Sequence, residues 1–340
     1  MDPVTLPLAR YDALPDALLR IGPREIRSVF PDPALIHLEG LAGAPVFLSV
    51  LLHGNETTGF FVLQRLAHWM RSHKLPRPLI IFVGNVHATE AGVRHLAAQP
   101  DYNRIWEGGP GPEHALAMEV LAVARDARPF AAIDIHNNTG LNPHYACVNR
   151  LEPEFLHLAS LFSPTLVTFN NPSSVISMAM ANICPAVTVE AGKSGDARGI
   201  ERAFDLVLDT LHLHAFRTSG LERKVSIYET VGRVELARHL SFGFTETSDA
   251  DLVFPADLER WNFTGLKAGT EFATSRVPAP VLRVVNARRE DITADFFARD
   301  GNAIRLTRDI TPSMLTRDPH ILREDCLCYL MQEIPAPVEA

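Results

Sequence analysis

The sequence predicts an α/β fold with a mixed, mostly parallel sheet flanked by helices, followed by a smaller, mainly β domain at the C-terminus. Two observations lead to this prediction. Over the first two-thirds of the chain, continuous apolar runs rich in β-branched residues alternate with helical patterns, as is typical of strands buried on both faces. After about residue 220, helical periodicity becomes sparse, and short strand-like segments alternate with turn signals.

The individual elements follow from these patterns. Apolar runs predict strands at 44–54, 77–86, 130–138, 165–171 and 185–192. Amphipathic periodicity predicts helices at 57–73, 112–128, 152–162, 173–182 and 197–216. We therefore expect one domain over residues 1–219 and a second, mainly β domain over residues 220–340.

Composition limits the classes of partner. The chain has 340 residues, of which 46% are hydrophobic and 21% charged, and its net charge of −8 offers no basic surface for nucleic acid. No apolar run reaches the ~20 residues of a membrane-spanning helix, so we expect no membrane partner. The N-terminus lacks the pattern of a signal peptide, and four cysteines are too few for a disulfide framework, which predicts a cytoplasmic protein. The sequence leaves homo-oligomerisation open.

Polar residues end three of the predicted strands. His53 follows the first apolar run, His136 ends "FAAIDIH", and Glu190 ends "AVTVE". Ligands of open α/β sheets bind at the carboxyl ends of the strands. We therefore expect these three side chains to meet at one edge of the sheet.

This set of residue types suits a metal site. His53 and Glu56 can supply two ligands from one tight loop, because Gly54 tolerates a sharp backbone bend, and His136 can supply a third. Catalytic zinc commonly has two His ligands and one carboxylate, with an open position for water. Alone, a His-x-x-Glu arises often by chance, and an isolated His136 can equally be an ordinary hydrogen-bonded histidine.

Four motifs in order, "HGNETTG", "GNVHATEAGVRHLAAQPDYNRIW", "DIHNNTG" and "VTVEAGK", resemble the succinylglutamate desuccinylase/aspartoacylase family of the zinc carboxypeptidase clan. The resemblance covers residues 46 to about 195 and implies a zinc-carboxypeptidase-like fold. It further implies one Zn²⁺ per chain, held by His53, Glu56 and His136, with Glu190 as the catalytic carboxylate.

The resemblance also implies roles for residues that bind substrate. Asn103 and Arg104 would bind a substrate carboxylate, and Arg94 would stabilise the oxyanion of the scissile carbonyl. Two departures from the family pattern weaken the match around Arg94: Val86 replaces a proline, and the gap from Arg94 to Asn103 is longer than the family norm.

Together these features predict a zinc-dependent amide hydrolase that acts on a small, anionic N-acyl amino acid. A metallocarboxypeptidase that removes C-terminal residues from peptides is the alternative enzyme. A metal-binding protein without catalysis is the alternative outside enzymes, although the presence of both Glu190 and Arg104 argues against it. Asn137, Asn138 and Tyr145 follow His136 and are expected to line the pocket.

Overall fold

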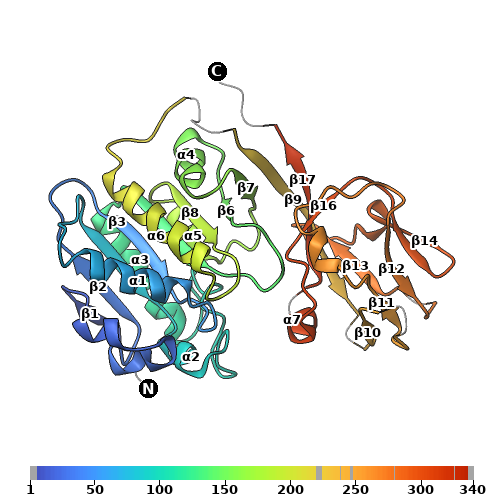
Figure 1. Cartoon of the computed structure of the whole chain (residues 1–340), viewed down its shortest axis with the longest axis horizontal. Helices are drawn as coiled ribbons and strands as arrows, with labels where there is room; N and C mark the ends of the chain where they lie inside the picture. Colours follow the sequence, from blue (N-terminus) through green and yellow to red (C-terminus); the bar gives the residue numbers. More distant parts are fainter. Residues whose placement is uncertain are drawn as a thin grey trace. The chain divides into compact units, whose positions relative to one another are not determined.

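A computed structural model describes residues 6–219, 224–237, 239–245, 248–278, 280–324 and 326–335 (Figure 1). Contacts divide these residues into two compact units. The first comprises the described residues up to Asn137 together with those of His144–Ser226, and the second comprises Asn138–Pro143 and Ile227–Pro335. The domain boundary expected at residue 220 lies outside the described residues. The contacts also assign Asn138–Pro143, part of the expected first domain, to the second unit.

The first unit is built on a mixed sheet that is mostly parallel, as predicted. Parallel pairing joins β4 to β3, β3 to β5 and β5 to β8, while β2–β4 and β6–β8 are antiparallel. In spatial order the strands are β1 (Ala9–Tyr11), β2 (Ala34–Leu38), β4 (Leu79–Val83), β3 (Val46–Val50), β5 (Ala131–His136), β8 (Ala186–Glu190), β6 (Tyr145–Val148) and β7 (Thr165–Thr168).

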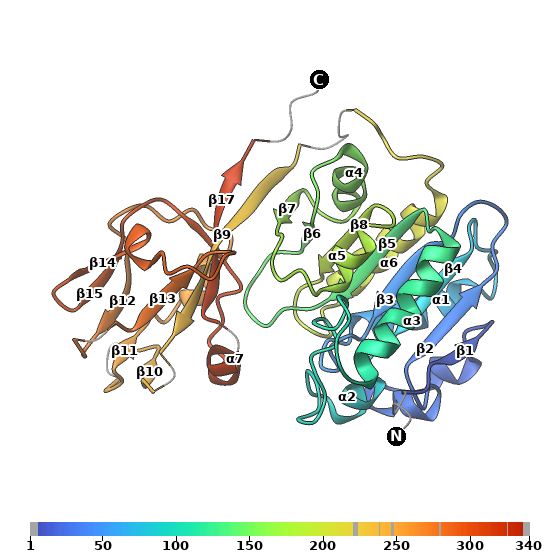
Figure 2. The same cartoon turned by 180° about the vertical axis from the view of Figure 1, so that it is seen from behind.

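Helices lie on both faces of the sheet, so that its central strands are buried on both sides. Figure 1 shows α1 and α6 in front of the sheet, and Figure 2, seen from behind, shows α3 in front. The helices are α1 (Thr58–Trp69), α2 (Val86–Ala91), α3 (Pro112–Ala127), α4 (Pro153–Phe162), α5 (Ile176–Met180) and α6 (Ala197–His212), with 3₁₀ turns η1 (Asp16–Arg20) and η2 (Pro23–Ser28). Each of the five helices expected from periodicity is present. β1, β2, β6 and α2 were not predicted.

The second unit is β-rich, as predicted, and has its own hydrophobic core. In one group of strands, β9 (Ser226–Leu236) pairs antiparallel with both β17 (Cys328–Ile334) and β13 (Leu282–Val285), and β17 pairs with β16 (Thr311–Ser313). A separate sheet contains β10 (Phe242–Gly243), β11 (Leu252–Val253), β12 (Glu271–Ser275), β15 (Ala303–Leu306) and β14 (Phe297–Asp300). The short helical elements are η3 (Leu258–Trp261), η4 (Thr293–Asp295) and α7 (Pro319–Glu324).

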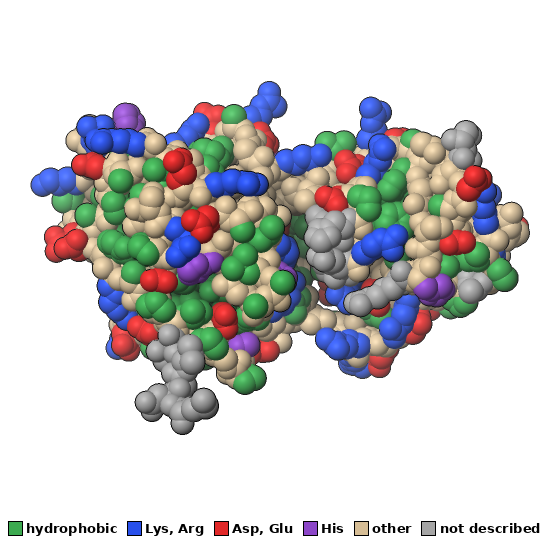
Figure 3. Space-filling view, turned by 90° about the horizontal axis from the view of Figure 1, so that it is seen from below, with side chains coloured by type: hydrophobic (Ala, Val, Ile, Leu, Met, Phe, Trp, Pro, Cys, Tyr) green, Lys and Arg blue, Asp and Glu red, His purple; other side chains and the backbone are tan. Residues whose placement is uncertain are grey.

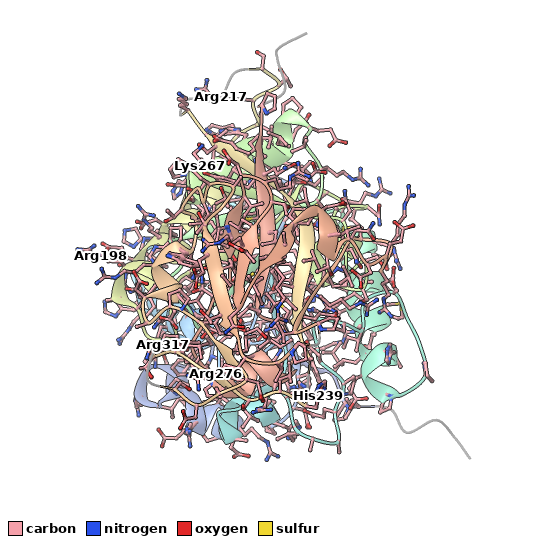
Figure 4. All side chains as sticks on the ribbon, turned by 90° about the vertical axis from the view of Figure 1, so that its right-hand side faces the viewer. Arg198, Arg217, His239, Lys267, Arg276 and Arg317 are labelled. Carbon is pink, nitrogen blue, oxygen red and sulfur yellow. The ribbon has the colours of Figure 1, made fainter. Side chains whose placement is uncertain are left out.

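Charges of both signs are distributed over the surface. On the face drawn in Figure 3, basic and acidic side chains are interspersed among hydrophobic ones. Exposed cations of the second unit include Lys267 and Arg276 (Figure 4), which pair with Asp309 and Asp249. No helix in the described part of the chain has both the length and the apolar character that crossing a membrane requires.

Candidate metal centre

The loop after β3 carries the first two expected ligands. Leu51 has a positive φ of 58°, which is uncommon for a residue with a side chain, and it turns the chain out of the strand. In the tight turn that follows, the Glu56 N–H donates to the His53 carbonyl oxygen over 3.2 Å. A Cβ atom at Gly54 would lie 2.1 Å from a backbone carbon of α2. Glycine is therefore required here by the close approach of α2, rather than by the backbone bend that the sequence suggested.

His136 joins these two residues from the end of β5. Its Nδ1 lies 2.8 Å from Glu56 Oε2, and His53 Nδ1 lies 2.7 Å from Glu56 Oε1. The three side chains are buried, and one ligand atom from each lies within 4.8 Å of the others. The structure thus brings together the three side chains that the sequence proposed as ligands. Two imidazoles and one carboxylate form a donor set that fits a divalent cation such as zinc.

Each histidine has a second carboxylate on its other ring nitrogen. His53 Nε2 lies 2.9 Å from Asp101 Oδ1, and His136 Nε2 lies 2.7 Å from Asp134 Oδ2. A carboxylate at Nε2 holds a proton on that nitrogen, so that Nδ1 is the ring atom that can bind a metal once it carries no proton of its own. Both rings are therefore oriented with Nδ1 toward the centre.

The charges at the centre suit metal ligands. Burial alone would raise the pKa of Glu56, but the charges of His53 and His136 and their hydrogen bonds lower it well below its usual range. Burial would lower the pKa of His136, yet Asp134 and Glu56 raise it well above its usual value. Glu56 is therefore ionised, and a metal that binds His136 must displace a proton.

Glu190 lies beside the centre because β5 and β8 are paired in register, with His136 opposite Glu190. Figure 2 shows β3, β5 and β8 side by side. Burial, aided by the charges of Glu56 and Asp134, raises the pKa of Glu190 to about 8, although His136 and Arg94 act in the opposite direction. Its Oε2 is buried and has no hydrogen-bond partner among the described residues. An unpaired carboxyl that titrates near neutral pH is suited to proton transfer.

Arg94 reaches the same centre from the segment after α2. Its Nε and Nη2 donate to Asp101 Oδ2 over 3.1 and 2.9 Å, and its Nη1 lies 3.5 Å from Glu56 Oε1. The Arg94 carbonyl oxygen accepts the N–H of Gly54 over 3.1 Å. The side chain is 40% exposed, so this guanidinium borders both the metal ligands and solvent.

Asn103 and Arg104 occupy the next turn of that segment. Asn103 is buried, with Nδ2 3.4 Å from His136 Nε2, and its Oδ1 accepts the N–H of Ile176 at the start of α5 over 3.0 Å. Arg104 is partly exposed and donates through Nη1 to the Asn103 carbonyl oxygen over 2.8 Å. Binding of substrate by these two residues stays a prediction. The structure adds that Asn103 also anchors α5.

Sequence reasoning assigned no role to the supporting residues Asp101, Asp134 and Ser194, and expected Asn137 to line the pocket. Asn137 is buried at the centre: its N–H donates to Glu56 Oε2 over 3.0 Å, and its side chain joins Thr58 to the Gly192 carbonyl oxygen. Ser194 Oγ donates to the Asn55 carbonyl oxygen, so that it ties the two loops of the site together. A signal existed only for Asp134, since alternation along β5 places it on the same face as His136.

Comparison with known proteins agrees with this geometry. The family model "Succinylglutamate desuccinylase/Aspartoacylase catalytic domain" matches residues 42–211, which is half of the chain. This chain belongs to that family. A succinylglutamate desuccinylase of Pseudomonas fluorescens is 37% identical over 89 residues, which is 24% of this chain and 26% of that protein. The chain thus matches about a quarter of the length of this curated relative.

Two solved structures show the same fold. The desuccinylase of Chromobacterium violaceum has a TM-score of 0.59 at 18% identity, covering 87% of this chain and 86% of that one. Murine aminoacylase 3 has a TM-score of 0.56 at 16% identity, covering 86% and 95%. At such low sequence identity, this likeness shows that the folds are similar and shows nothing about activity. The matched range contains every expected site residue, from His53 to Glu190.

Proposed function

We propose that this protein is a zinc-dependent amide hydrolase that deacylates a small N-acyl amino acid or a related anionic amide. The observation that carries the proposal is the convergence of His53, Glu56 and His136 at one edge of the sheet, with the unpaired carboxyl of Glu190 on the adjacent strand. Membership of the family supports the class of reaction, and the names of the relatives suggest N-succinylglutamate as the first substrate to test.

The three ligands would hold zinc through Nδ1 of both histidines and the carboxylate of Glu56. When bound, the ion would supply Lewis acidity toward the amide carbonyl and lower the pKa of a water molecule toward ~7. Zinc is our choice from the donor set and the family, because cobalt and manganese also accept imidazole and carboxylate ligands.

Glu190 would act as general base and then as general acid. Its carboxylate would accept a proton from the attacking water, and Oε2 would return that proton to the leaving amine. Burial raises the pKa of Glu190 to about 8 in the metal-free protein, and a bound zinc ion would favour its ionised form, so that the carboxylate could first accept the proton and then return it.

The arginines would bind and orient an anionic substrate. Arg94 lies 3.5 Å from a ligand oxygen of Glu56, so that the negative charge developing on the carbonyl oxygen would come within reach of its guanidinium. Arg104, with its planar set of donors, would bind the substrate carboxylate beside Asn103. A divalent cation and two arginines would balance the four carboxylates of the site, and the partly exposed guanidiniums of Arg94 and Arg104 would be the charges open to an anionic substrate.

The test combines metal analysis with a substrate panel. We expect about one zinc per chain and hydrolysis of N-succinyl, N-acetyl or N-formyl amino acids that is abolished by a chelator and restored by zinc. Cleavage of peptides with a free C-terminus, without any deacylation, would instead assign a metallocarboxypeptidase. Protein that takes up no metal from a zinc-replete solution would overturn the proposal.

A further inference from the structure

The hydroxyl group of Ser194 holds the chain on both sides of the candidate ligand Glu56. Ser194 Oγ donates to the Asn55 carbonyl oxygen over 2.8 Å and accepts the N–H of Thr57, also over 2.8 Å. Thr57 Oγ1 lies 2.8 Å from the same oxygen, and it is the donor in that pair, because the only hydroxyl proton of Ser194 goes to Asn55. A serine hydroxyl has one donor and two acceptor positions. All three are therefore used by the two residues that flank Glu56.

The loop that carries Ser194 is itself held on both sides. It connects β8 to α6. Before Ser194, the Gly192 carbonyl oxygen accepts a hydrogen bond from Asn137 Nδ2 over 2.9 Å. After it, Asp196 Oδ2 lies 2.8 Å from His144 Nε2. Ser194 therefore makes its three hydrogen bonds from a loop whose own position is fixed by neighbouring elements.

The same contacts replace the usual cap at the start of α1. Thr57 is the N-cap residue of this helix, yet its side chain accepts no N–H of the first turn, although threonine is a common capping residue. Its hydroxyl bonds to Ser194 instead, and the N–H of Thr58 is satisfied by Asn137 Oδ1 over 3.1 Å. The first residues after Glu56 are therefore held by side chains from other loops of the site.

We propose that Ser194 is a positioning residue that fixes the loop of His53 and Glu56 relative to Glu190. Ser194 follows Glu190 by four residues on the same segment, and it bonds to a loop that lies 137–139 positions away in the chain. It thus links the candidate metal ligands to the candidate general base. A displacement of about 1 Å between reacting groups can cost on the order of 10²-fold in rate. The positioning role rests on the proposed function, whereas the hydrogen bonds of the hydroxyl do not.

The first experiment is amide hydrogen exchange of the metal-free protein, followed by NMR. Ser194→Ala removes the acceptor of the Thr57 N–H, so exchange at Thr57 should become roughly 3–10-fold faster. Exchange at Thr58 should change less, because Asn137 accepts that N–H. Unchanged exchange at Thr57 would overturn the proposal. Since no metal or substrate takes part, this result does not depend on whether the protein is a zinc deacylase.

The second experiment measures zinc affinity against a competing chelator, and kcat and KM of the zinc-loaded protein. Ser194→Ala should lower kcat by roughly 10–100-fold and weaken zinc binding by up to about tenfold. KM should change by less than about twofold, because the substrate-binding arginines keep their own contacts. Ser28→Ala is the matched control: Ser28 is also exposed, and its hydroxyl donates to the Glu25 carbonyl oxygen over 2.7 Å.

Two further variants separate positioning from general destabilisation. Ser194→Thr keeps the hydroxyl, and its added methyl group can point into solvent because Ser194 is exposed, so kcat should return to within about threefold of the wild type. Thr57→Val removes one of the three bonds and should give a smaller loss than Ser194→Ala, and it provides the comparison if that variant does not fold. Faster exchange at Thr57 with unchanged kcat and zinc affinity would overturn the positioning role. A wild-type protein that neither binds zinc nor hydrolyses an amide would instead overturn the proposed function.

Discussion

The two histidines of the candidate centre are supported by carboxylates in contrasting surroundings. On the loop side, Asp101 lies between His53 and Arg94, also accepts the N–H of Asn103, and its side chain is 17% exposed. On the sheet side, Asp134 lies within β5, its side chain is 4% exposed, and among the ion pairs of the described residues its only partner is His136. Asp101 therefore orients the His53 ring from within a cluster of paired charges, whereas Asp134 orients the His136 ring from a buried position in the sheet.

This difference shows which side of the site can respond to substrate. Arg94 is partly exposed, and a substrate oxyanion could compete with Asp101 for its guanidinium. Asp134 has no comparable alternative, because strand pairing fixes it within β5 and its side chain is buried. We expect the loop side to adjust during a reaction cycle while the sheet side keeps the metal ligands in place. The predictions below test this contrast, from the largest expected effect to the smallest.

Removal of a candidate ligand should abolish metal binding, whether that ligand lies on the loop side or on the sheet side. His53→Ala and His136→Ala should each reduce zinc affinity by more than the ~10–100-fold expected for supporting residues, because a coordinate bond is lost. Zinc per chain after dialysis measures this. The control is His68→Ala, since His68 is an exposed residue of α1. Stoichiometric zinc in either ligand variant would contradict the ligand assignment.

Replacement of Glu190 should separate catalysis from metal binding. Glu190→Gln keeps the shape of the side chain but cannot accept a proton, so turnover should fall by roughly 10²–10⁴-fold. Zinc content should stay at the wild-type level, because Glu190 is absent from the cluster of candidate ligands. Steady-state kinetics beside metal analysis tests both parts. A nearly normal rate would exclude Glu190 as the general base.

The sequence alone did not predict most of the difference between the loop side and the sheet side of the centre. The strand ends placed His53, His136 and Glu190 at one edge, because register in a parallel sheet follows from apolar patterning. Asp101 and His53 lie 48 positions apart in the chain, and their contact depends on how the loops pack rather than on any local motif. The meeting of these side chains at one edge was therefore predictable, whereas the contacts that support them were only partly so.

The same reasoning explains which elements were missed. The strands β10 and β11 have two residues each, too few for alternation to be recognised. Longer elements such as α3 and α6, with 16 residues each, carry enough apolar periodicity to be assigned. Short strands owe their existence to their neighbours in the sheet, so the sequence around them gives little signal.

The pH dependence of stability should reveal the buried carboxyl of Glu190. Its pKa is raised from 4.5 to about 8, so the folded, metal-free protein holds a proton that the unfolded chain releases between these pH values. The free energy of unfolding should therefore fall as pH rises from 4.5 to 8, by an amount on the order of a few kcal/mol. Denaturant titrations of wild type and Glu190→Gln test this, because the glutamine variant should lack this contribution. Equal slopes for the two proteins would contradict the raised pKa.

The smallest expected effect is the salt dependence of the coupling energy between Arg94 and Asp101 on the loop side. The Arg94–Asp101 pair is partly exposed, so its coupling should be about 0.2–1 kcal/mol and should weaken with salt. A double-mutant cycle of Arg94→Ala and Asp101→Asn, measured by unfolding of metal-free protein at low and high ionic strength, isolates this term. The cycle of Asp134→Asn with His136→Ala is the buried counterpart and should change little with salt. If both cycles respond equally to salt, solvent reaches Asp134 as readily as Asp101, and the distinction between a responsive loop side and a fixed sheet side fails.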